Sequence, residues 1–314
     1  MLSICIPIFN CDVSILVNKL IYLLDNQNIK YEIILIDDCS DDKFKKTNSV
    51  LNNYKSVKYI QLETNIGRSK IRNHFLNFAL FENLLFLDCD SQIADEKFIF
   101  QYLIEIKNNK KVICGGRTYL NSKPGSNKFL RWNYGMKREC KSAEIRKKNP
   151  YKSFLTNNFI VKKSILNQIK FNEELSTYGH EDTLFGYELK NLNIEISHIQ
   201  NPVNHLFTET NKEFLEKTAQ GIKNLAYIEK QLNDENFSEE VKILKTYLKV
   251  KKYNLQIPLF LILSIINPFI YFILKNTGRN LLFFDIYKIY LLIKEKLIYD
   301  KKLFKIINQP KAQI

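Results

Sequence analysis

Two carboxylates that lie two residues apart, Asp88 and Asp90, directly follow the apolar run at residues 84–87. In an extended chain such residues share a face, so both carboxylates could bind one divalent cation. Mg²⁺ and Mn²⁺ prefer carboxylate and phosphate oxygens, and a bound cation would neutralise a leaving diphosphate. The alternative interpretation is an acidic turn that caps the next helix, since Asp is common in both settings.

A second acidic pair, Asp37 and Asp38, follows the apolar run at residues 32–36 in the same way. These carboxylates could accept hydrogen bonds from a nucleotide base or a ribose. Ser40 or Asp41 could also cap the following helix. The two interpretations are compatible because they use different residues.

A third acidic pair, Glu181 and Asp182, follows Gly179 at the start of a helix predicted over residues 181–190. A carboxylate in this position could act as the general base for a sugar hydroxyl. The alternative is that the two acidic residues only complement the helix macrodipole.

Apolar runs alternate with amphipathic stretches through the first half of the chain, which indicates strands followed by helices. The predicted strands cover residues 3–8, 32–36, 57–62, 84–87 and 111–114, and the predicted helices cover residues 13–24, 42–52, 69–81 and 96–106. The alternation favours a mostly parallel central sheet flanked by helices on both faces. Such sheets bind ligands at the carboxyl ends of their strands.

The strand and helix pattern is lost over residues 118–150, which we interpret as a functional loop because idle loops of this length are uncommon. It returns at residues 154–164. Beyond residue 211 the composition changes to lysine-rich helical segments. We therefore predict an α/β catalytic domain over residues 1–210 and an α-helical C-terminal extension over residues 211–314.

Five motifs in a fixed order resemble the family 2 glycosyltransferases, over about the first two-thirds of the chain. They are Ser3-Ile4-Cys5-Ile6-Pro7-Ile8-Phe9-Asn10, Ile36-Asp37-Asp38-Cys39-Ser40-Asp41, Asn65-Ile66-Gly67-Arg68-Ser69-Lys70-Ile71-Arg72-Asn73, Asp88-Cys89-Asp90 and His180-Glu181-Asp182. Asn157-Asn158-Phe159 and the residues before Glu181 resemble a bacterial branch that builds surface polysaccharides. The resemblance implies the GT-A nucleotide-diphospho-sugar transferase fold.

The same resemblance implies a role for each matching residue. Contacts with the nucleotide sugar are expected from Pro7, Phe9, Asp37, Asp38, Gly67, Arg72, Asn73 and Asp88. Asp90 would hold the metal ion, with Asp88 and the downstream His205 as further ligands. Asp182 would be the catalytic base, and Glu181 would orient the acceptor or share its proton. We expect acceptor contacts from Trp132, Tyr178 and His180.

These roles imply an inverting, metal-dependent transfer of a sugar from a nucleotide-diphosphate donor to the hydroxyl of a glycan or a lipid-linked glycan. Family habit favours UDP as the nucleotide, Mn²⁺ or Mg²⁺ as the metal, and a hexosyl or N-acetylhexosaminyl group. One alternative is a sugar nucleotidyltransferase, disfavoured because no glycine follows the first strand. Another is a non-catalytic nucleic-acid-binding protein, suggested only by the net charge of +14; we expect no nucleic-acid partner.

Six cysteines without a CxxC pair indicate a reducing compartment, and the first residues lack a basic leader, so we expect a cytoplasmic protein. Residues 254–274 carry no charge and are long enough to span a bilayer, but Pro268 would break a simple spanning helix. From residue 281 apolar residues alternate with lysines, as in an interfacial helix. Attachment to the inner face of the cytoplasmic membrane, packing on the catalytic domain and a true span all remain open.

Overall fold

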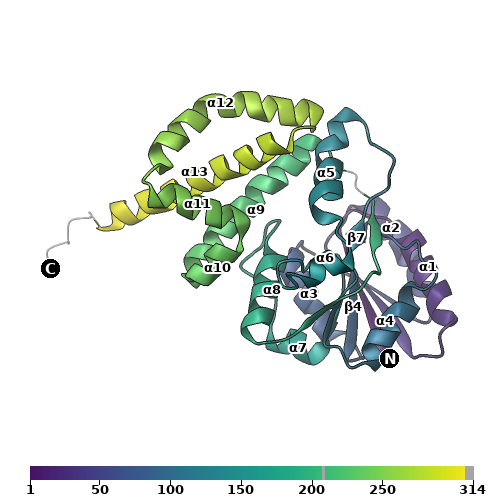
Figure 1. The fold of residues 1–314 in the computed structure, drawn as a ribbon. Helices are drawn as coiled ribbons and strands as arrows, with labels where there is room; N and C mark the ends of the chain where they lie inside the picture. The colour runs from purple at the N-terminus through teal and green to yellow at the C-terminus, as the bar shows by residue number, and fades with distance from the viewer. Residues whose placement is uncertain (207–208, 308–314) are drawn as a thin grey trace, which may run out of the picture. The chain divides into compact units, whose positions relative to one another are not determined.

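The computed structural model of the chain describes residues 1–206 and 209–307 (Figure 1). The chain separates into two compact units. The first comprises Met1–Lys123, Tyr134–Thr177 and Glu181–Thr208, and the second comprises Pro124–Asn133, Tyr178–His180 and Glu209–Ile314.

The first unit is built on a seven-stranded sheet with the order β3-β2-β1-β4-β8-β6-β9 in the described residues. The strand bounds are β1 Leu2–Ile8, β2 Tyr31–Asp37, β3 Val57–Gln61, β4 Asn83–Leu87, β6 Val112–Cys114, β8 Asn158–Lys162 and β9 Ile196–His198. β8 runs antiparallel to β4 and β6, whereas the other pairs are parallel. The predicted mostly parallel sheet and its five predicted strands are confirmed.

Helices cover both faces of this sheet, as the alternating pattern predicted. Their bounds are α1 Ser14–Asp25, α2 Asp42–Ser49, α3 Arg68–His74, α4 Phe98–Lys107, α7 Lys163–Gln168 and α8 Glu181–Asn191. One buried apolar cluster joins α1 and α4 to alternate residues of β1, and a second joins α3, α7 and α8 to the opposite face. The inner strands β1, β2, β4, β6 and β8 are therefore mostly buried on both sides, which is why their sequences read as apolar runs.

The ladder between β1 and β4 ends before the carboxyl end of β1. β1 pairs with β2 from Leu2 to Ile8 but with β4 only from Ser3 to Cys5. Pro7, which has no amide hydrogen to donate, lies beyond the end of the β4 ladder. The strand order reverses between β1 and β4, and the residues that follow these strands therefore lie where open α/β sheets bind ligands.

Residues 118–150, predicted as a loop, contain several short helices instead. α5 (Phe129–Tyr134) is followed by a five-residue π-helix, Gly135–Glu139, and by α6 (Ala143–Lys147). Helices of five or six residues complete too few turns to show an apolar period, so this correction could not be read from the sequence.

The second unit is helical in the residues described. Its helices beyond residue 210 are α9 Asn211–Leu232, α10 Glu235–Glu240, α11 Lys242–Lys252, α12 Gln256–Thr277 and α13 Leu281–Ile307. Asn211, whose side chain is fully buried, joins three parts of this unit: it accepts from the amide of Leu130 and donates to the carbonyls of Ser126 and Lys275. The segment before α5 is thereby attached to the helices of the second unit.

Candidate active site

The acidic pair after β2 is used to shape the surrounding loops. Asp37 accepts hydrogen bonds from the amide of Ser40 at 2.7 Å and the hydroxyl of Tyr59 at 2.8 Å. Asp38 accepts from the amides of Ile66 and Gly67 at 2.7 and 3.1 Å. Burial raises the pKa of the Asp38 carboxyl. Both aspartates are buried: Asp37 fixes the turn after β2, and Asp38 fixes the loop that leads into α3. Their contact with a base or ribose stays a prediction.

Gly67 adopts a backbone conformation that glycine alone accepts easily. Its φ is +83°, and a Cβ atom built on it would lie 2.9 Å from the carbonyl oxygen of Ser176. The constraint keeps the amide of Gly67 directed at Asp38 and starts α3 at the next residue. α3 then positions Arg68 and Arg72.

Arg72 joins the end of β4 to the start of α8. Its guanidinium is buried, and it donates to Asp88 Oδ1 at 3.1 Å and lies 3.7 Å from Glu181 Oε1. Arg68 donates to the same Glu181 oxygen at 3.3 Å. Arg117 lies 3.8 Å from the second oxygen of Asp88. The result is a chain of alternating charges that links the first and third acidic pairs.

Arg117 is a charged residue of this cluster that the sequence reasoning missed. It lies in β7 (Arg117–Thr118) and pairs with Glu139 at 2.9 Å, which in turn accepts from the hydroxyl of Tyr119. The nearest sequence signal is Gly115-Gly116 just before it, where Gly116 has a φ of +90°. That signal marks a turn but gives no reason to connect Arg117 with Asp88.

Asp90 and His205 form a second group of interacting side chains in the site, apart from the arginine and carboxylate cluster. β5 (Ser91–Gln92) and β10 (Val203–His205) pair antiparallel with His205 opposite Ser91, and this register places the imidazole beside Asp90. Nδ1 of His205 lies 3.1 Å from Oδ2 of Asp90. Burial raises the pKa of the Asp90 carboxyl, but the hydrogen bond and charge of His205 outweigh it, so the pKa lies below its usual range.

Two buried atoms of this pair, Oδ1 of Asp90 and Nε2 of His205, have no hydrogen-bond partner among the described residues. Buried polar atoms are nearly always satisfied, so these two atoms on neighbouring side chains mark a place where a ligand could bind. Across the described part of the chain, no group of three or more His, Cys, Asp or Glu side chains could hold a metal ion. A cation here would therefore have two protein ligands, with its other positions open.

Asp182 lies at the start of α8, half-buried, and differs sharply from its neighbour Glu181. Burial, then the repulsion of Glu181, raises the pKa of Asp182 to about 7. Its Oδ1 accepts from the amide of Thr183 at 2.7 Å. Glu181 is buried too, but Arg68 and Arg72 compensate its charge. The pair thus contains one stabilised carboxylate and one that can take up a proton near neutral pH.

The remaining predicted donor residues, Phe9 and Asn73, have different surroundings. Phe9 follows β1 and has an exposed ring, which suits stacking against a base. Asn73 is buried and exchanges hydrogen bonds with the backbone of Phe171, so it anchors the segment before α8. Their donor contacts stay predictions.

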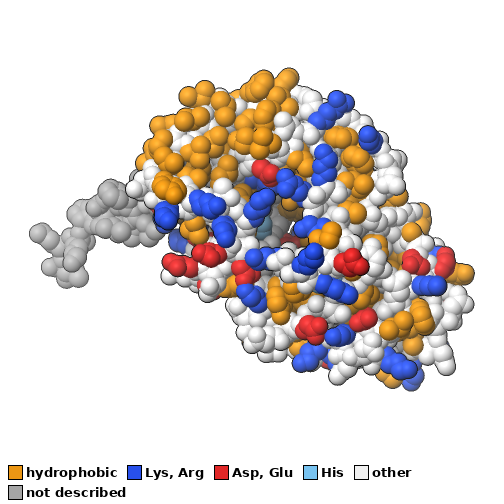
Figure 2. Space-filling view, viewed as in Figure 1, with side chains coloured by type: hydrophobic (Ala, Val, Ile, Leu, Met, Phe, Trp, Pro, Cys, Tyr) orange, Lys and Arg blue, Asp and Glu red, His pale blue; other side chains and the backbone are white. Residues whose placement is uncertain are grey.

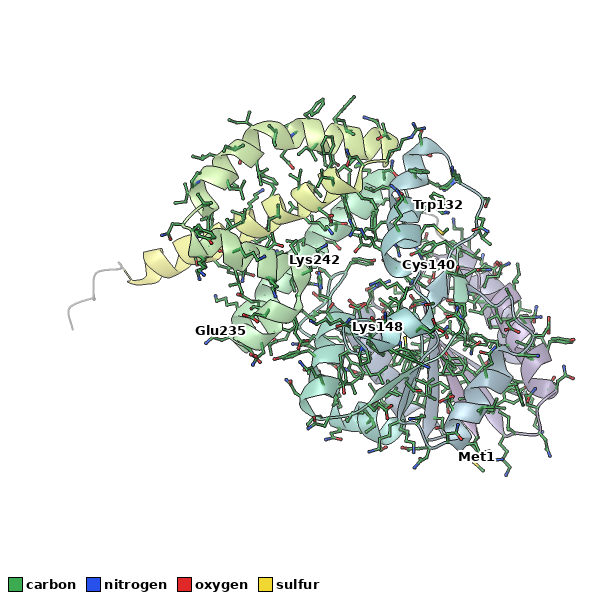
Figure 3. All side chains as sticks on the ribbon, viewed as in Figure 1. Met1, Trp132, Cys140, Lys148, Glu235 and Lys242 are labelled. Carbon is green, nitrogen blue, oxygen red and sulfur yellow. The ribbon has the colours of Figure 1, made fainter. Side chains whose placement is uncertain are left out.

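The three predicted acceptor residues belong to the second unit. Trp132 is largely buried on α5, where its ring packs on Phe129 with centroids 5.2 Å apart (Figure 3). The carbonyls of Tyr178 and Gly179 accept from Asn224 of α9. His180 follows with a φ of +68°. The contribution of Trp132, Tyr178 and His180 to an acceptor site stays a prediction.

His198, the last residue of β9, is enclosed by the protein. Its Nδ1 meets Arg146 at 2.7 Å and its Nε2 meets the carbonyl of Pro150 at 2.8 Å. Burial lowers the pKa of His198 to about 4. Arg146 also donates to the carbonyls of Cys114, Gly115 and Ile199. Both side chains are thus used to hold α6 against β9.

The chain resembles known proteins in sequence. The model of glycosyl transferase family 2 matches residues 3–170, more than half of the chain. A teichoic acid poly(glycerol phosphate) polymerase of Staphylococcus epidermidis is 27% identical over 47% of this chain and 20% of its own length. The poly(ribitol-phosphate) beta-N-acetylglucosaminyltransferase TarP of Staphylococcus aureus is 32% identical over 36% of this chain and 35% of its own length. The chain thus spans well under half the length of these relatives.

Solved structures match nearly the whole chain at low identity. The mannosyltransferase PcManGT of Pyrobaculum calidifontis, in complex with GDP-Man and Mn²⁺, aligns over 96% of this chain and 87% of its own with a TM-score of 0.61 and 13% identity. Residues 1–349 of S. aureus TarS align over 96% and 91% with a TM-score of 0.51 and 21% identity. These likenesses confirm the GT-A fold, and with the family match they show that the chain belongs to glycosyl transferase family 2.

Proposed function

We propose that this chain is an inverting, metal-dependent glycosyltransferase that moves a hexosyl or N-acetylhexosaminyl group from a UDP-sugar to a hydroxyl of a surface glycan or its lipid-linked precursor. The observation that carries the proposal is the asymmetry of the third acidic pair. Asp182, with a pKa of about 7, can accept a proton at neutral pH, whereas Glu181 is paired with Arg68 and Arg72. An enzyme that deprotonates a sugar hydroxyl needs a base of this kind.

Asp182 would take the proton from the acceptor hydroxyl as that oxygen attacks the anomeric carbon. The bond from that carbon to the diphosphate oxygen breaks in the same step, on the opposite face, so the configuration inverts. Glu181, fixed by its arginines, raises the proton affinity of Asp182 by its charge and does not compete for the proton. The buried ion pairs keep this arrangement in place before substrate arrives, which is the condition for efficient positioning.

Asp90 and His205 fit a divalent cation. Nδ1 of His205 and Oδ2 of Asp90 lie 3.1 Å apart, so a cation held by these two atoms would take the place of the hydrogen bond between them. One carboxylate oxygen and one imidazole nitrogen suit Mn²⁺ better than Mg²⁺, which prefers oxygen alone. A bound cation would supply positive charge to the departing diphosphate.

Asp88 is better placed as an anchor for arginines than as a metal ligand. Its two oxygens face Arg72 and Arg117 at 3.1 and 3.8 Å. We therefore assign the metal to Asp90 and His205, and give Asp88 the task of orienting the two guanidinium groups. Guanidinium groups held in this way could bind the negatively charged diphosphate.

The choice of donor and acceptor class rests on relatives. TarS has been solved in complex with UDP-GlcNAc, with a TM-score of 0.50 to this chain. The curated relatives TarP and the S. epidermidis polymerase are named for teichoic-acid polymers. They support UDP as the nucleotide and a cell-surface polymer as the destination of the sugar.

The decisive experiment is a donor screen on the purified full chain. A panel of UDP- and GDP-sugars is incubated with and without Mn²⁺, and slow donor hydrolysis and donor binding are measured. We expect one UDP-sugar to bind and to be hydrolysed in a Mn²⁺-dependent manner. Asp182→Asn should still bind the donor but lose transfer, while Asp25→Asn on α1 should keep both. If no nucleotide sugar binds with either metal, the proposal is wrong.

A further inference from the structure

The outer side of α12 is a continuous apolar surface. From residue 257 to residue 272 every exposed position of this helix is apolar; these positions, which we call the α12 face, are Ile257, Pro258, Leu261, Ile262, Ile265, Ile266, Pro268, Phe269 and Phe272. Ile265 is 80% exposed and Phe272 65%. Figure 2 shows hydrophobic side chains gathered over α12. Soluble monomers rarely expose a strip of this length, about 22 Å at 1.5 Å per residue.

α12 is the one helix of the described chain that is long and apolar enough to cross a bilayer, yet only 17% of its most apolar window is buried. A core helix of similar composition would be mostly buried. The α12 face therefore requires a partner that covers it.

The opposite side of α12 is packed against its own unit. Leu263, Ile270 and Leu274 are buried there, and the rings of Phe260 and Tyr290 stack with centroids 5.8 Å apart. The contacts run along the helix to α13 and α9. A helix attached along its whole length cannot cross a bilayer unless these contacts break, so α12 would lie in the plane of a membrane.

In the structure α12, and not α13, is the helix suited to a membrane interface. The sequence pattern favoured the stretch from residue 281, but in α13 the apolar side chains of Phe284, Tyr287, Leu292 and Ile293 are buried. Lys296 of α13 is buried as well and pairs with Glu229 of α9. The exposed apolar surface belongs to α12.

The basic residues around the α12 face indicate that its partner is negatively charged. Residues 241–284 contain no Asp or Glu. Seven basic residues in this stretch flank the face at both ends and are all exposed: Lys242, Lys245, Lys249, Lys251, Lys252, Lys275 and Arg279. A second copy of the chain would bring two such basic sets together, which is unfavourable. An anionic lipid surface would accept both the apolar strip and its basic borders.

We propose that the α12 face and its basic borders seat the second unit on an anionic lipid bilayer, with α12 in the plane of the interface. The attachment does not depend on the proposed chemistry, so either can fail alone. It would keep the enzyme at the surface where a lipid-linked acceptor lies.

Flotation of the full chain with lipid vesicles tests the proposal. We expect binding to vesicles of equal parts phosphatidylglycerol and phosphatidylcholine, and at least tenfold weaker binding to phosphatidylcholine alone or in 0.5 M salt, since about 1 kcal/mol per basic residue is screened. Ile265→Glu should reduce binding at least tenfold. Ile15→Glu is the matched control, because Ile15 is 82% exposed on α1 of the first unit.

A spectroscopic reporter distinguishes this contact from charge attraction alone. The chain has one tryptophan, Trp132, so Phe269→Trp adds a second emitter within the α12 face. Its emission should shift to shorter wavelength when anionic vesicles are added, and unmodified protein should show no such shift. Donor hydrolysis without vesicles should be the same in Ile265→Glu and wild type.

Three results would overturn the proposal. The first is no binding to anionic vesicles, or equal binding by Ile265→Glu and Ile15→Glu. The second is a dimer in vesicle-free solution that Ile265→Glu dissociates, which would assign the face to a second copy. The third is protein that stays in membranes after alkaline carbonate extraction, which would show that α12 spans the bilayer.

Discussion

Nδ1 of His205 lies 3.1 Å from Oδ2 of Asp90, although the two residues are far apart in the sequence. The contact depends on a small three-stranded sheet with the order β5-β10-β7. β5 directly follows Asp90, and β10 returns antiparallel to it with His205 as its last residue. The small sheet therefore fixes the relative position of Asp90 and His205, which suits the cation site proposed above.

Removal of the side chain of either Asp90 or His205 should weaken Mn²⁺ binding. We expect Asp90→Ala and His205→Ala each to weaken Mn²⁺ affinity by at least tenfold, because each leaves the cation a single protein ligand. Titration calorimetry with Mn²⁺ alone measures this effect without any donor. His74→Ala on α3 serves as the control, and equal Mn²⁺ affinity in His205→Ala and wild type would remove His205 from the site.

The pH dependence of transfer should follow the proton on Asp182. Because burial raises its pKa to about 7, the carboxyl is protonated below that pH and cannot act as a base. We expect kcat/KM to rise with pH to a plateau above an inflection near 7. Asp182→Asn should lower kcat about 10²- to 10⁴-fold and abolish the inflection. A pH profile that is unchanged in this variant would assign the base elsewhere.

Arg72 should matter far more for stability than Arg68, although both contact Glu181. Arg72 is buried between Asp88 and Glu181, so Arg72→Met leaves two carboxylates without their main partner and should cost about 3–5 kcal/mol. The Arg68 side chain is 43% exposed, and Arg68→Met should cost about 1 kcal/mol or less. Urea unfolding monitored by circular dichroism compares the two variants, and similar losses would contradict the structure.

Gly67 and Gly221 should respond in opposite ways to alanine. Gly67→Ala meets a positive φ and a backbone oxygen at 2.9 Å, so a loss of about 1–3 kcal/mol is expected. Gly221 lies within α9, where the nearest atom to an added Cβ is 3.5 Å away. Gly221→Ala should be neutral or stabilising by up to about 1 kcal/mol. Melting temperatures of the two variants test the contrast.

His198 should make the fold sensitive to mild acid. Its pKa falls from 6.5 to about 4 on folding, so the unfolded chain binds one more proton between these values. The contribution of His198 to the free energy of unfolding is therefore fully present above pH 6.5. It declines as the pH falls toward 4, by up to about 1.4 kcal/mol per pH unit. His198→Gln should be less stable at neutral pH but lose this part of the slope. Parallel slopes for the two proteins from pH 6.5 to 4 would refute the assignment.

Some of the site could be predicted from local sequence because its signals are local. An apolar run that ends in an acidic pair identifies a buried strand and its carboxyl end, and this holds for Asp37 and Asp88. The start of α8 at Glu181 was also predicted, since Gly179 and two acidic residues mark a helix N-terminus.

Other features depend on partners distant in the sequence, and only the tertiary structure decided them. Arg117 joins the site because β7 pairs with β10, and two-residue strands carry no recognisable period. α12 and α13 are both apolar, so their composition could not tell which of them is covered. Packing decided it: α13 buries its apolar side against the second unit, and α12 leaves most of its own exposed.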